Sequence, residues 1–218
     1  MRTSVSEAVP LGGIQMLLHA FVPASRANGP GLRAVIHFQG CSLNCPGCWN
    51  PTSHKFRGTE QTTTIASVVQ EFEAAMRSSP LEGVTFSGGE PMQQVRALVE
   101  LMGEIRRVAP SASMGMFTGY TAPELDEGQY ATRPITPSVE RHRLWRIVRD
   151  HLDFAVMGRY DRTQPGTEPL RTSKNQELVL FSGRYEERDF GQQFVEVGID
   201  QRGIAVVTGF PILGFPTS

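Results

Sequence analysis

The sequence has almost no net charge and no long apolar run. Its 21 Lys and Arg residues nearly balance 22 Asp and Glu residues, which gives a formal net charge of −1. Such a chain has no broad basic field that would attract nucleic acid or an anionic membrane. No apolar stretch approaches the roughly 20 residues that cross a bilayer, and the N-terminal stretch has no convincing signal-peptide cleavage site. We therefore expect a cytoplasmic protein with no nucleic-acid or membrane partner.

Cysteine is also scarce. The 218 residues contain three cysteines, and all of them lie within GCSLNCPGCWN. An odd number of cysteines this close in sequence cannot link distant segments, which argues against a secreted disulfide framework. Cys41, Cys45 and Cys48 instead indicate a metal or reactive site in a reducing compartment.

The hydrophobic pattern predicts an α/β fold. The length of 218 residues, with 39% hydrophobic and 20% charged residues, favours one large domain, and no internal repeat is present. Strand patterns alternate with helix patterns. The expected strands are 33–40, 83–91 with a terminal glycine turn, 113–119, 152–158 and 176–181. The expected helices run from Thr62–Thr64 to Pro80, from Pro91 to Pro110, and through Leu144–His151.

Repeated strand-helix units imply parallel strands joined by right-handed crossovers, with function on the loops at the carboxyl ends of the strands. The cysteine loop follows the strand 33–40, and SGGEP, residues 87–91, ends the next strand. We therefore expect these two loops to face one another. Near the C-terminus, two alternating apolar runs around DQRG, residues 200–203, predict a β-hairpin.

Three thiolates on one short loop leave two interpretations open. A structural zinc site prefers four protein ligands, and His54 could complete a Cys3His set. Alternatively, three thiolates could hold three irons of a [4Fe-4S] cluster and leave the fourth iron open to another ligand. The spacing alone does not choose between them.

The combination of motifs adds a family resemblance. Cys41-x3-Cys45-x2-Cys48 followed by Ser87-Gly88-Gly89-Glu90-Pro91 resembles the radical S-adenosylmethionine (SAM) superfamily. More narrowly, the chain is similar to the activating enzymes of glycyl radical enzymes, on the segments NGPGLR (28–33), FQGC, CPGCWNP and GVTFSGGEPMQQ. The branch that activates anaerobic ribonucleotide reductase is indicated by FTGYT (117–121), MGRYD (157–161) and SKNQEL (173–178).

The resemblance implies a partial (β/α)6-type radical SAM barrel over residues 1–182. Within it, residues 40–50 would form the cluster loop and residues 87–91 the SAM-binding turn. Residues 183–218 would form a C-terminal β-hairpin extension packed on the same domain. An incomplete barrel has too few strand-helix units to close and keeps an open side.

The resemblance also implies a chemistry. Cys41, Cys45 and Cys48 would hold a [4Fe-4S] cluster at which SAM is cleaved reductively to a 5′-deoxyadenosyl radical. The methionine ammonium of SAM would be lined by Ser87, Gly88, Gly89 and Glu90. Trp49 and Asn50 would flank adenine or cover the cluster, and Thr118 would meet the ribose or the substrate.

The expected partners follow from the same resemblance. An external one-electron donor such as flavodoxin or ferredoxin would reduce the cluster, and the radical would be installed on a glycyl radical enzyme such as anaerobic ribonucleotide reductase. Asn28, Met157 and Lys174 depart from the relatives' pattern, which motivates a second hypothesis: a small-molecule or peptide substrate. A third hypothesis, from another class, is a structural Cys3His zinc module.

Overall fold

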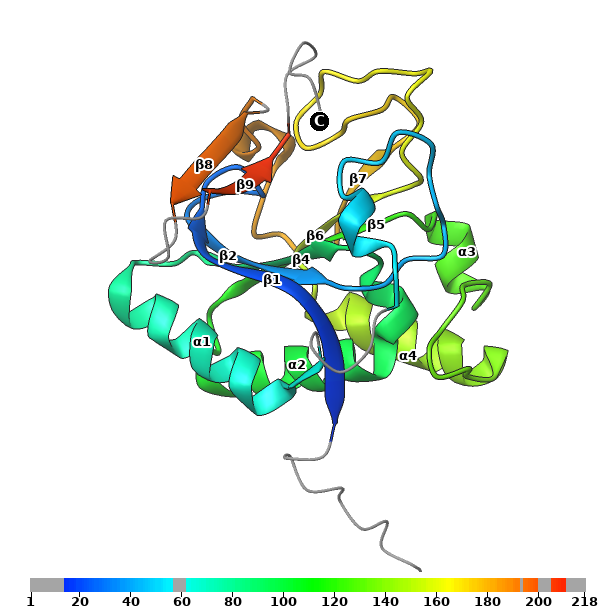
Figure 1. Cartoon of the computed structure of the whole chain (residues 1–218), viewed down its shortest axis with the longest axis horizontal. Coiled ribbons are helices and arrows are strands. Elements are labelled where there is room, and N and C mark those ends of the chain that lie inside the picture. The colour runs from blue at the N-terminus through cyan, green and yellow to red at the C-terminus, as the bar shows by residue number, and fades with distance from the viewer. Residues whose placement is uncertain (1–13, 57–61, 193, 200–204, 211–218) are drawn as a thin grey trace, which may run out of the picture.

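The computed structural model describes residues 14–56, 62–192, 194–199 and 205–210. It contains a seven-stranded sheet of order β3-β1-β2-β4-β5-β6-β7 and a two-stranded sheet, β8-β9 (Figure 1). The strands are β1 (Gln15–Ser25), β2 (Arg33–Phe38), β3 (Thr62–Thr64), β4 (Gly83–Gly88), β5 (Ser113–Thr118), β6 (Phe154–Met157), β7 (Glu177–Leu180), β8 (Val195–Ile199) and β9 (Ala205–Gly209). The α-helices are α1 (Ile65–Ser78), α2 (Val95–Val108), α3 (Ala122–Asp126) and α4 (Ser138–His151), and short 3-10 turns cover Pro51–Ser53, Pro91–Gln94 and Glu187–Asp189.

The centre of the large sheet is parallel. Strands β2, β4, β5 and β6 pair in parallel, whereas β1, β3 and β7 pair antiparallel at the two sides. The predicted α/β class and the parallel pairing are therefore confirmed. Among the described residues the sheet has four parallel strands, so it does not by itself establish a barrel of six units. No helix in the described ranges is long and apolar enough to cross a membrane.

Some elements differ from the sequence prediction. Strand β1 was not expected, because Gln15 and His19 interrupt its apolar residues and most of its residues are partly or fully exposed. Thr62–Thr64 also forms a short strand, β3, against β1. The predicted helix start is confirmed, because Thr64 caps α1 by accepting a hydrogen bond from the Ser67 amide at 3.2 Å. Helix α3 lies between the expected strand 113–119 and the expected helix at Leu144–His151, where no helix was predicted.

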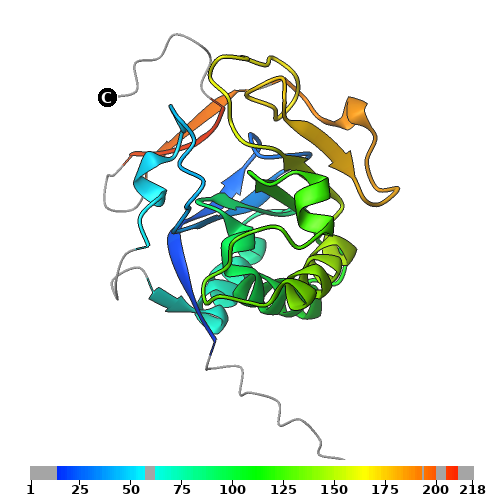
Figure 2. The same ribbon diagram turned by 90° about the vertical axis from the view of Figure 1, so that its right-hand side faces the viewer.

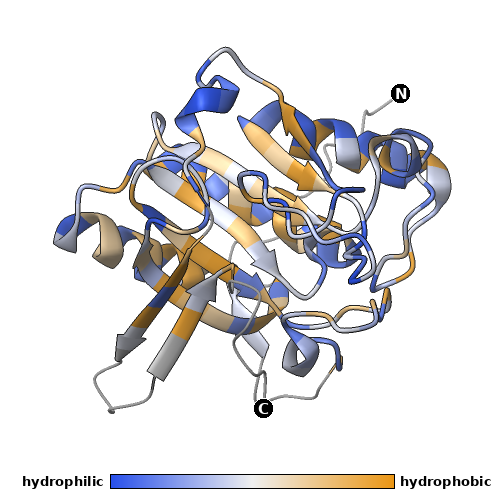
Figure 3. Ribbon diagram, turned by 90° about the horizontal axis from the view of Figure 1, so that it is seen from above, coloured by the Kyte–Doolittle hydropathy of each residue, from blue (hydrophilic) through white to orange (hydrophobic). Residues whose placement is uncertain are grey.

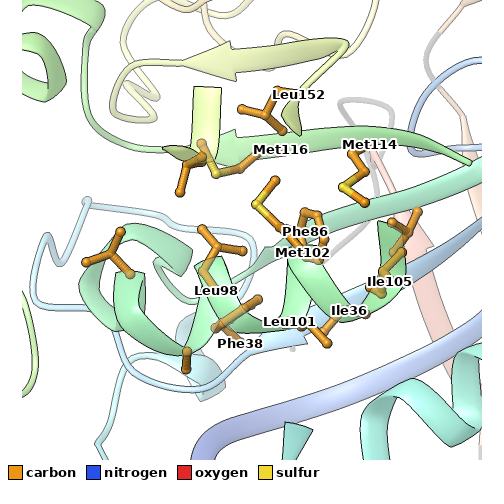
Figure 4. Packing of buried hydrophobic residues seen from close by; sticks show 14 of the residues in the cluster. Ile36, Phe38, Phe86, Leu98, Leu101, Met102, Ile105, Met114, Met116 and Leu152 are labelled. Carbon is orange, nitrogen blue, oxygen red and sulfur yellow. The ribbon is translucent and has the colours of Figure 1, made fainter. Parts of the chain in front are cut away.

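The core lies between the sheet and the helices. Apolar side chains that alternate along the strands point to this face, since successive side chains of a strand point to opposite sides. Figure 4 shows how closely these side chains pack between α2 and the strands of the sheet. Those labelled are Ile36, Phe38, Phe86, Leu98, Leu101, Met102, Ile105, Met114, Met116 and Leu152, all 3% exposed or less.

In the described part of the chain, the long helices cover one face of the sheet only. The helices α1, α2 and α4 lie on one side, while the C-terminal strands β8 and β9 lie across from them (Figure 2). Side chains on the face towards β8 and β9 form a second, smaller apolar cluster. Figure 3 shows that the strands of the large sheet are mostly hydrophobic. Strands β8 and β9 pair antiparallel, and the predicted turn at 200–203 lies outside the described residues.

Arg33 ties the parallel strands together on this second face. Its side chain is 0% exposed, and its guanidinium donates to Thr85 Oγ1 at 2.9 Å, to Val84 O at 2.9 Å and to Ser113 O at 3.1 Å. The guanidinium also lies over the Phe154 ring, 5.1 Å from its centroid. One cation thus joins β2, β4, β5 and β6 away from the carboxyl ends of the strands.

We predict that Arg33→Met lowers the free energy of unfolding by about 3 kcal/mol, because several buried acceptors lose a charged donor at once. Urea-induced unfolding of the purified protein measures this change. The matched control is Arg96→Ala, whose salt bridge with Glu140 is largely in solvent, and we expect a loss of about 0.5 kcal/mol. Equal losses in the two variants would contradict the structural role of Arg33.

Candidate functional site

A cavity of about 260 Å³ opens at the carboxyl ends of the parallel strands. Residues that are far apart in the sequence line it, as expected for loops that follow neighbouring parallel strands. The ten predicted site residues all belong to its lining: Cys41, Cys45, Cys48, Trp49, Asn50, Ser87, Gly88, Gly89, Glu90 and Thr118. The expectation that the two motif loops face one another is thereby confirmed.

The cysteine loop begins directly after β2 and is closed by its own backbone. The Gly40 amide donates to Ser53 O at 2.7 Å, and the Cys41 amide donates to His54 O at 2.9 Å. Inside the loop, the Cys48 amide donates to Cys45 O at 3.1 Å. The three thiols are therefore presented from a loop whose two ends are joined.

Buried glutamines hold this loop in place, and sequence reasoning assigned them no role. Gln39 Nε2 donates to Lys55 O at 2.5 Å, and Gln94 Nε2 donates to Gln39 O at 2.9 Å. Gln93 accepts from the Ser42 amide at 3.0 Å and donates to the Ser42 hydroxyl at 2.8 Å. In the sequence, only their position in the motifs FQGC and PMQQ distinguished these glutamines. Their partners are distant in the sequence, so no local pattern showed the contacts.

The glycine turn after β4 touches the start of the cysteine loop. The Gly89 amide donates to Phe38 O at 2.7 Å, and the Glu90 amide donates to Gly40 O at 2.9 Å. A Cβ on Gly89 would lie 2.5 Å from Gly40 O, and Gly88 has φ of +95°. The turn therefore requires glycine at 88 for its backbone conformation and at 89 for the close approach.

Glu90 is the buried acid of the site. Its side chain is 1% exposed and accepts hydrogen bonds from the Met92 amide at 3.0 Å, the Thr118 hydroxyl at 2.9 Å and the Gly119 amide at 2.7 Å. Burial raises its pKa to about 7 in spite of these donors. A cation placed in the cavity next to Glu90 would favour the charged carboxylate.

The environment of Cys41 and of Cys48 disfavours the thiolate form. Burial, followed by the charge of Glu90, raises the pKa of Cys41 to about 11, and burial also raises the pKa of Cys48. A bound metal would oppose both effects, because thiolate is the ligand form. In the described part of the chain no three His, Cys, Asp or Glu side chains converge on the position of a single ion. Thiolates that each bind a different iron of a cluster have no need to converge.

Two further observations fit a group bound beside the cysteines. Trp49 Nε1 is buried and has no hydrogen-bond partner among the described residues, while its ring packs against Tyr160 with centroids 5.8 Å apart. The Asn50 amide donates to Cys48 Sγ at 3.4 Å, as sulfur ligands commonly accept. His54, the candidate fourth zinc ligand, also lines the cavity.

Sequence reasoning missed one side of the cavity. Its residues are apolar and come from the middle and the end of the chain: Phe117, Val156, Leu170, Val207 and Phe210. An apolar residue in a strand looks the same in sequence whether it faces a core or a cavity, so no local signal distinguished them. The C-terminal two lie beyond the region of family resemblance.

Comparisons with known proteins agree with the motifs. The model of the family described as "4Fe-4S single cluster domain" matches residues 27–179. An anaerobic ribonucleoside-triphosphate reductase-activating protein from Vibrio cholerae is 28% identical over 177 residues, covering 77% of this chain and 99% of that protein. The protein of the same name from bacteriophage T4 is 24% identical over 158 residues, covering 72% of this chain and 88% of its own length.

A putative glycyl-radical enzyme activating enzyme from Haemophilus influenzae is 39% identical over 97 residues, covering 44% of this chain and 36% of that protein. Among solved structures, QueE from Escherichia coli matches with a TM-score of 0.39 and 16% identity, over 51% of this chain and 55% of that one. The predicted resemblance to activating enzymes of glycyl radical enzymes is confirmed by the sequence relatives.

We predict that Gly89→Ala lowers the free energy of unfolding by about 1–3 kcal/mol, since the new methyl group would collide with backbone that cannot retreat. Gly103→Ala is the control: Gly103 is an exposed helical glycine with no atom within 4 Å of a Cβ, and it should gain up to about 1 kcal/mol. Chemical unfolding of both variants measures the two changes in unfolding free energy, which should have opposite signs. A Gly89→Ala variant as stable as the native chain would rule out the close approach.

The acid stability of the protein should depend on Glu124. Arg159, in the loop after β6, donates to both Glu124 oxygens at 2.8 Å and holds the pKa of that carboxyl at about 2, below its usual 4.5. The unfolded state then binds more protons between these values, so the stabilisation is present above pH 4.5 and is lost as pH falls towards 2.

Glu124→Gln should therefore flatten the dependence of unfolding free energy on pH in this window, as measured by urea titrations at stepped pH. Arg159→Gln should flatten it in the same way, because either change removes the ion pair. An unchanged slope in both variants would show that the pair contributes nothing.

Proposed function

Because the chain belongs to the family of 4Fe-4S single-cluster domains, we propose that Cys41, Cys45 and Cys48 hold one [4Fe-4S] cluster and that SAM binds beside it. The observation that carries the proposal is that the three thiols and the turn Ser87–Glu90 line one cavity. Three thiolates leave one iron of the cluster without a protein ligand. The second motif borders the same cavity, so its residues would hold a ligand of that iron.

A cluster of this kind, reduced by one electron, supplies the electron that cleaves SAM to methionine and a 5′-deoxyadenosyl radical. The residues of the chain bind and orient the reactants. Glu90 offers a carboxylate to the methionine ammonium, and the glycines at 88 and 89 allow backbone to approach it. Trp49 offers the reactants its Nε1–H, which has no partner among the described residues. The backbone amide of Asn50 holds Cys48 by donating to its Sγ. Thr118 fixes the Glu90 carboxylate through its hydroxyl and borders the ribose or substrate position.

We propose that the hydrogen donor is a glycine of a partner protein, as in anaerobic ribonucleotide reductase. The names of the relatives from Vibrio cholerae and Haemophilus influenzae support this. The Cα–H bond of the glycine would break, a C–H bond would form at the 5′ carbon, and the unpaired electron would stay on the glycine. The electron consumed in SAM cleavage would come from an external donor such as flavodoxin or ferredoxin.

The domain organisation proposed with this function is a partial (β/α)6-type barrel over residues 1–182 and an extension over 183–218 packed on it. Contacts between the two support the arrangement. Phe210 packs on Phe117 with centroids 5.5 Å apart, and Tyr185 Oη donates to Glu82 at 2.9 Å.

The test uses protein reconstituted without oxygen. We expect about four irons and four sulfides per chain, and release of 5′-deoxyadenosine from SAM with dithionite as reductant. Cys45→Ala should lose most of the iron and the cleavage. His54→Ala is the matched control from the same cavity and should keep its iron. Bound zinc that depends on His54, without cleavage of SAM, would establish the structural zinc module and overturn the proposal.

A further inference from the structure

Two large apolar side chains stand in solvent at the start of α4. Ile135 is 91% exposed and Val139 is 83% exposed, and they are four residues apart. Thr136 between them is 1% exposed, and its carbonyl accepts from Arg141 at 2.8 Å, so the segment itself is anchored. Single exposed apolar residues are common on protein surfaces. The surroundings of these two decide whether they mark a contact site.

Three cations flank the exposed apolar side chains: Arg133, Arg143 and Arg146. The last two lie on the same side of α4 as Val139, since helical residues four and seven apart share a face. All three arginines are exposed, and none forms an ion pair with another described residue. Together these residues form what we call the α4 face: Arg133, Ile135, Val139, Arg143 and Arg146.

An aromatic ring connects the α4 face to the cysteine loop. The Arg133 guanidinium lies over the Phe56 ring, 4.2 Å from its centroid. That ring also packs against Gly40, where an added Cβ would overlap it. Gly40 precedes Cys41 in the chain, so a single side chain separates the surface cation from the backbone beside the first cysteine.

Hydrogen bonds make a second connection. The Arg133 amide donates to Gln93 O at 2.6 Å, and the Gln93 side chain accepts from the Ser42 amide at 3.0 Å. Ser42 follows Cys41 in the chain, so the α4 face is joined to the residues on both sides of this cysteine. The first turn of α4 lies at the carboxyl ends of the parallel strands, because the helix leads back to the start of β6.

We propose that the α4 face is the docking surface for the one-electron carrier, and that this carrier is an acidic protein. The inference rests on the proposed function, in which the carrier is oxidised by one electron and the cluster is reduced by one electron. A carrier must come close to the cluster and leave the cavity free for the reactants. None of the residues of the α4 face is among the described residues that line the cavity.

The charges of the α4 face select the sign of the partner. Glu140, in the first turn of α4, is already paired with Arg96 at 2.7 Å and does not neutralise the exposed arginines. Positive charge steers an acidic protein to the surface and speeds its association. A small apolar centre with a charged rim suits the small interfaces of electron-transfer complexes, which form and separate quickly.

A matched pair of variants tests the charge. Arg143 and Arg77 are exposed arginines in helices of 14 residues, and neither forms an ion pair with a described residue. Arg77 lies at the opposite end of the sheet, because α1 ends there and the chain continues to the start of β4. The probe is an oxidised flavodoxin of negative net charge. Its binding to the reconstituted protein is measured by isothermal titration calorimetry.

We expect Arg143→Glu to weaken flavodoxin binding about tenfold at 0.1 M salt, where charges act over about 10 Å. Arg77→Glu should keep the native affinity. Ile135→Ser should weaken binding about threefold through lost apolar contact, whereas Val197→Ser, at a position that is 66% exposed on β8, should not. The assignment is overturned if the native chain does not bind, if Arg143→Glu or Ile135→Ser binds like the native chain, or if the controls lose as much.

Rates of SAM cleavage separate this inference from the function on which it rests. Reduced flavodoxin and dithionite can each supply the electron, and Arg143→Glu should lower the ratio of the flavodoxin-driven to the dithionite-driven rate about tenfold. Cleavage with dithionite and an unchanged ratio would leave the radical chemistry and overturn the docking surface. Flavodoxin binding that depends on Arg143 and Ile135, without cleavage by either reductant, would uphold the docking surface and overturn the proposed chemistry.

Discussion

The site depends on a contact between two backbones. The turn after β4 reaches the end of β2 closely enough for Gly89 and Glu90 to donate to Phe38 and Gly40. That approach has no room for a side chain at 89, and it brings Glu90 and the cysteine loop into one cavity. The glutamines that clamp the loop from β2 and from the turn at Pro91–Gln94 act only because this distance is already short. Geometry at a scale of one methyl group therefore controls the position of the thiols.

The alternation of side chains along each strand separates stability from chemistry. One set of residues packs against the helices and forms the large core, and the intervening set faces the side without helices. On β2 and β4 that second set begins with Arg33 and Thr85 and ends with His37 and Ser87 at the cavity. The same strands thus carry a buried hydrogen-bond network at one end and the site at the other.

Short motifs and the parallel pairing of the strands that carry them were predictable from the sequence, whereas long-range packing was not. The cysteines and Ser87–Glu90 follow strands with clear apolar patterns, and parallel pairing brings such loops together, so their common cavity could be anticipated. Strand β1 could not, because its polar interruptions hide the period. The contact of Asn28 with Thr208 joins residues 180 positions apart, and no local pattern encodes such a pair. The roles of the glutamines were invisible for the same reason.

The core behind the site is rich in thioethers. Met92, Met102, Met114 and Met116 are all 0% exposed and belong to the large apolar cluster, and Figure 4 shows the last three between the sheet and α2. While the chain is folded, dissolved oxidants cannot reach these sulfur atoms. Once it opens, conversion to sulfoxide would place polar groups where the core has no partners for them, and the chain could not close again. Exposure of the unfolded chain to air would therefore prevent refolding through oxidation of these methionines, independently of what happens to any iron.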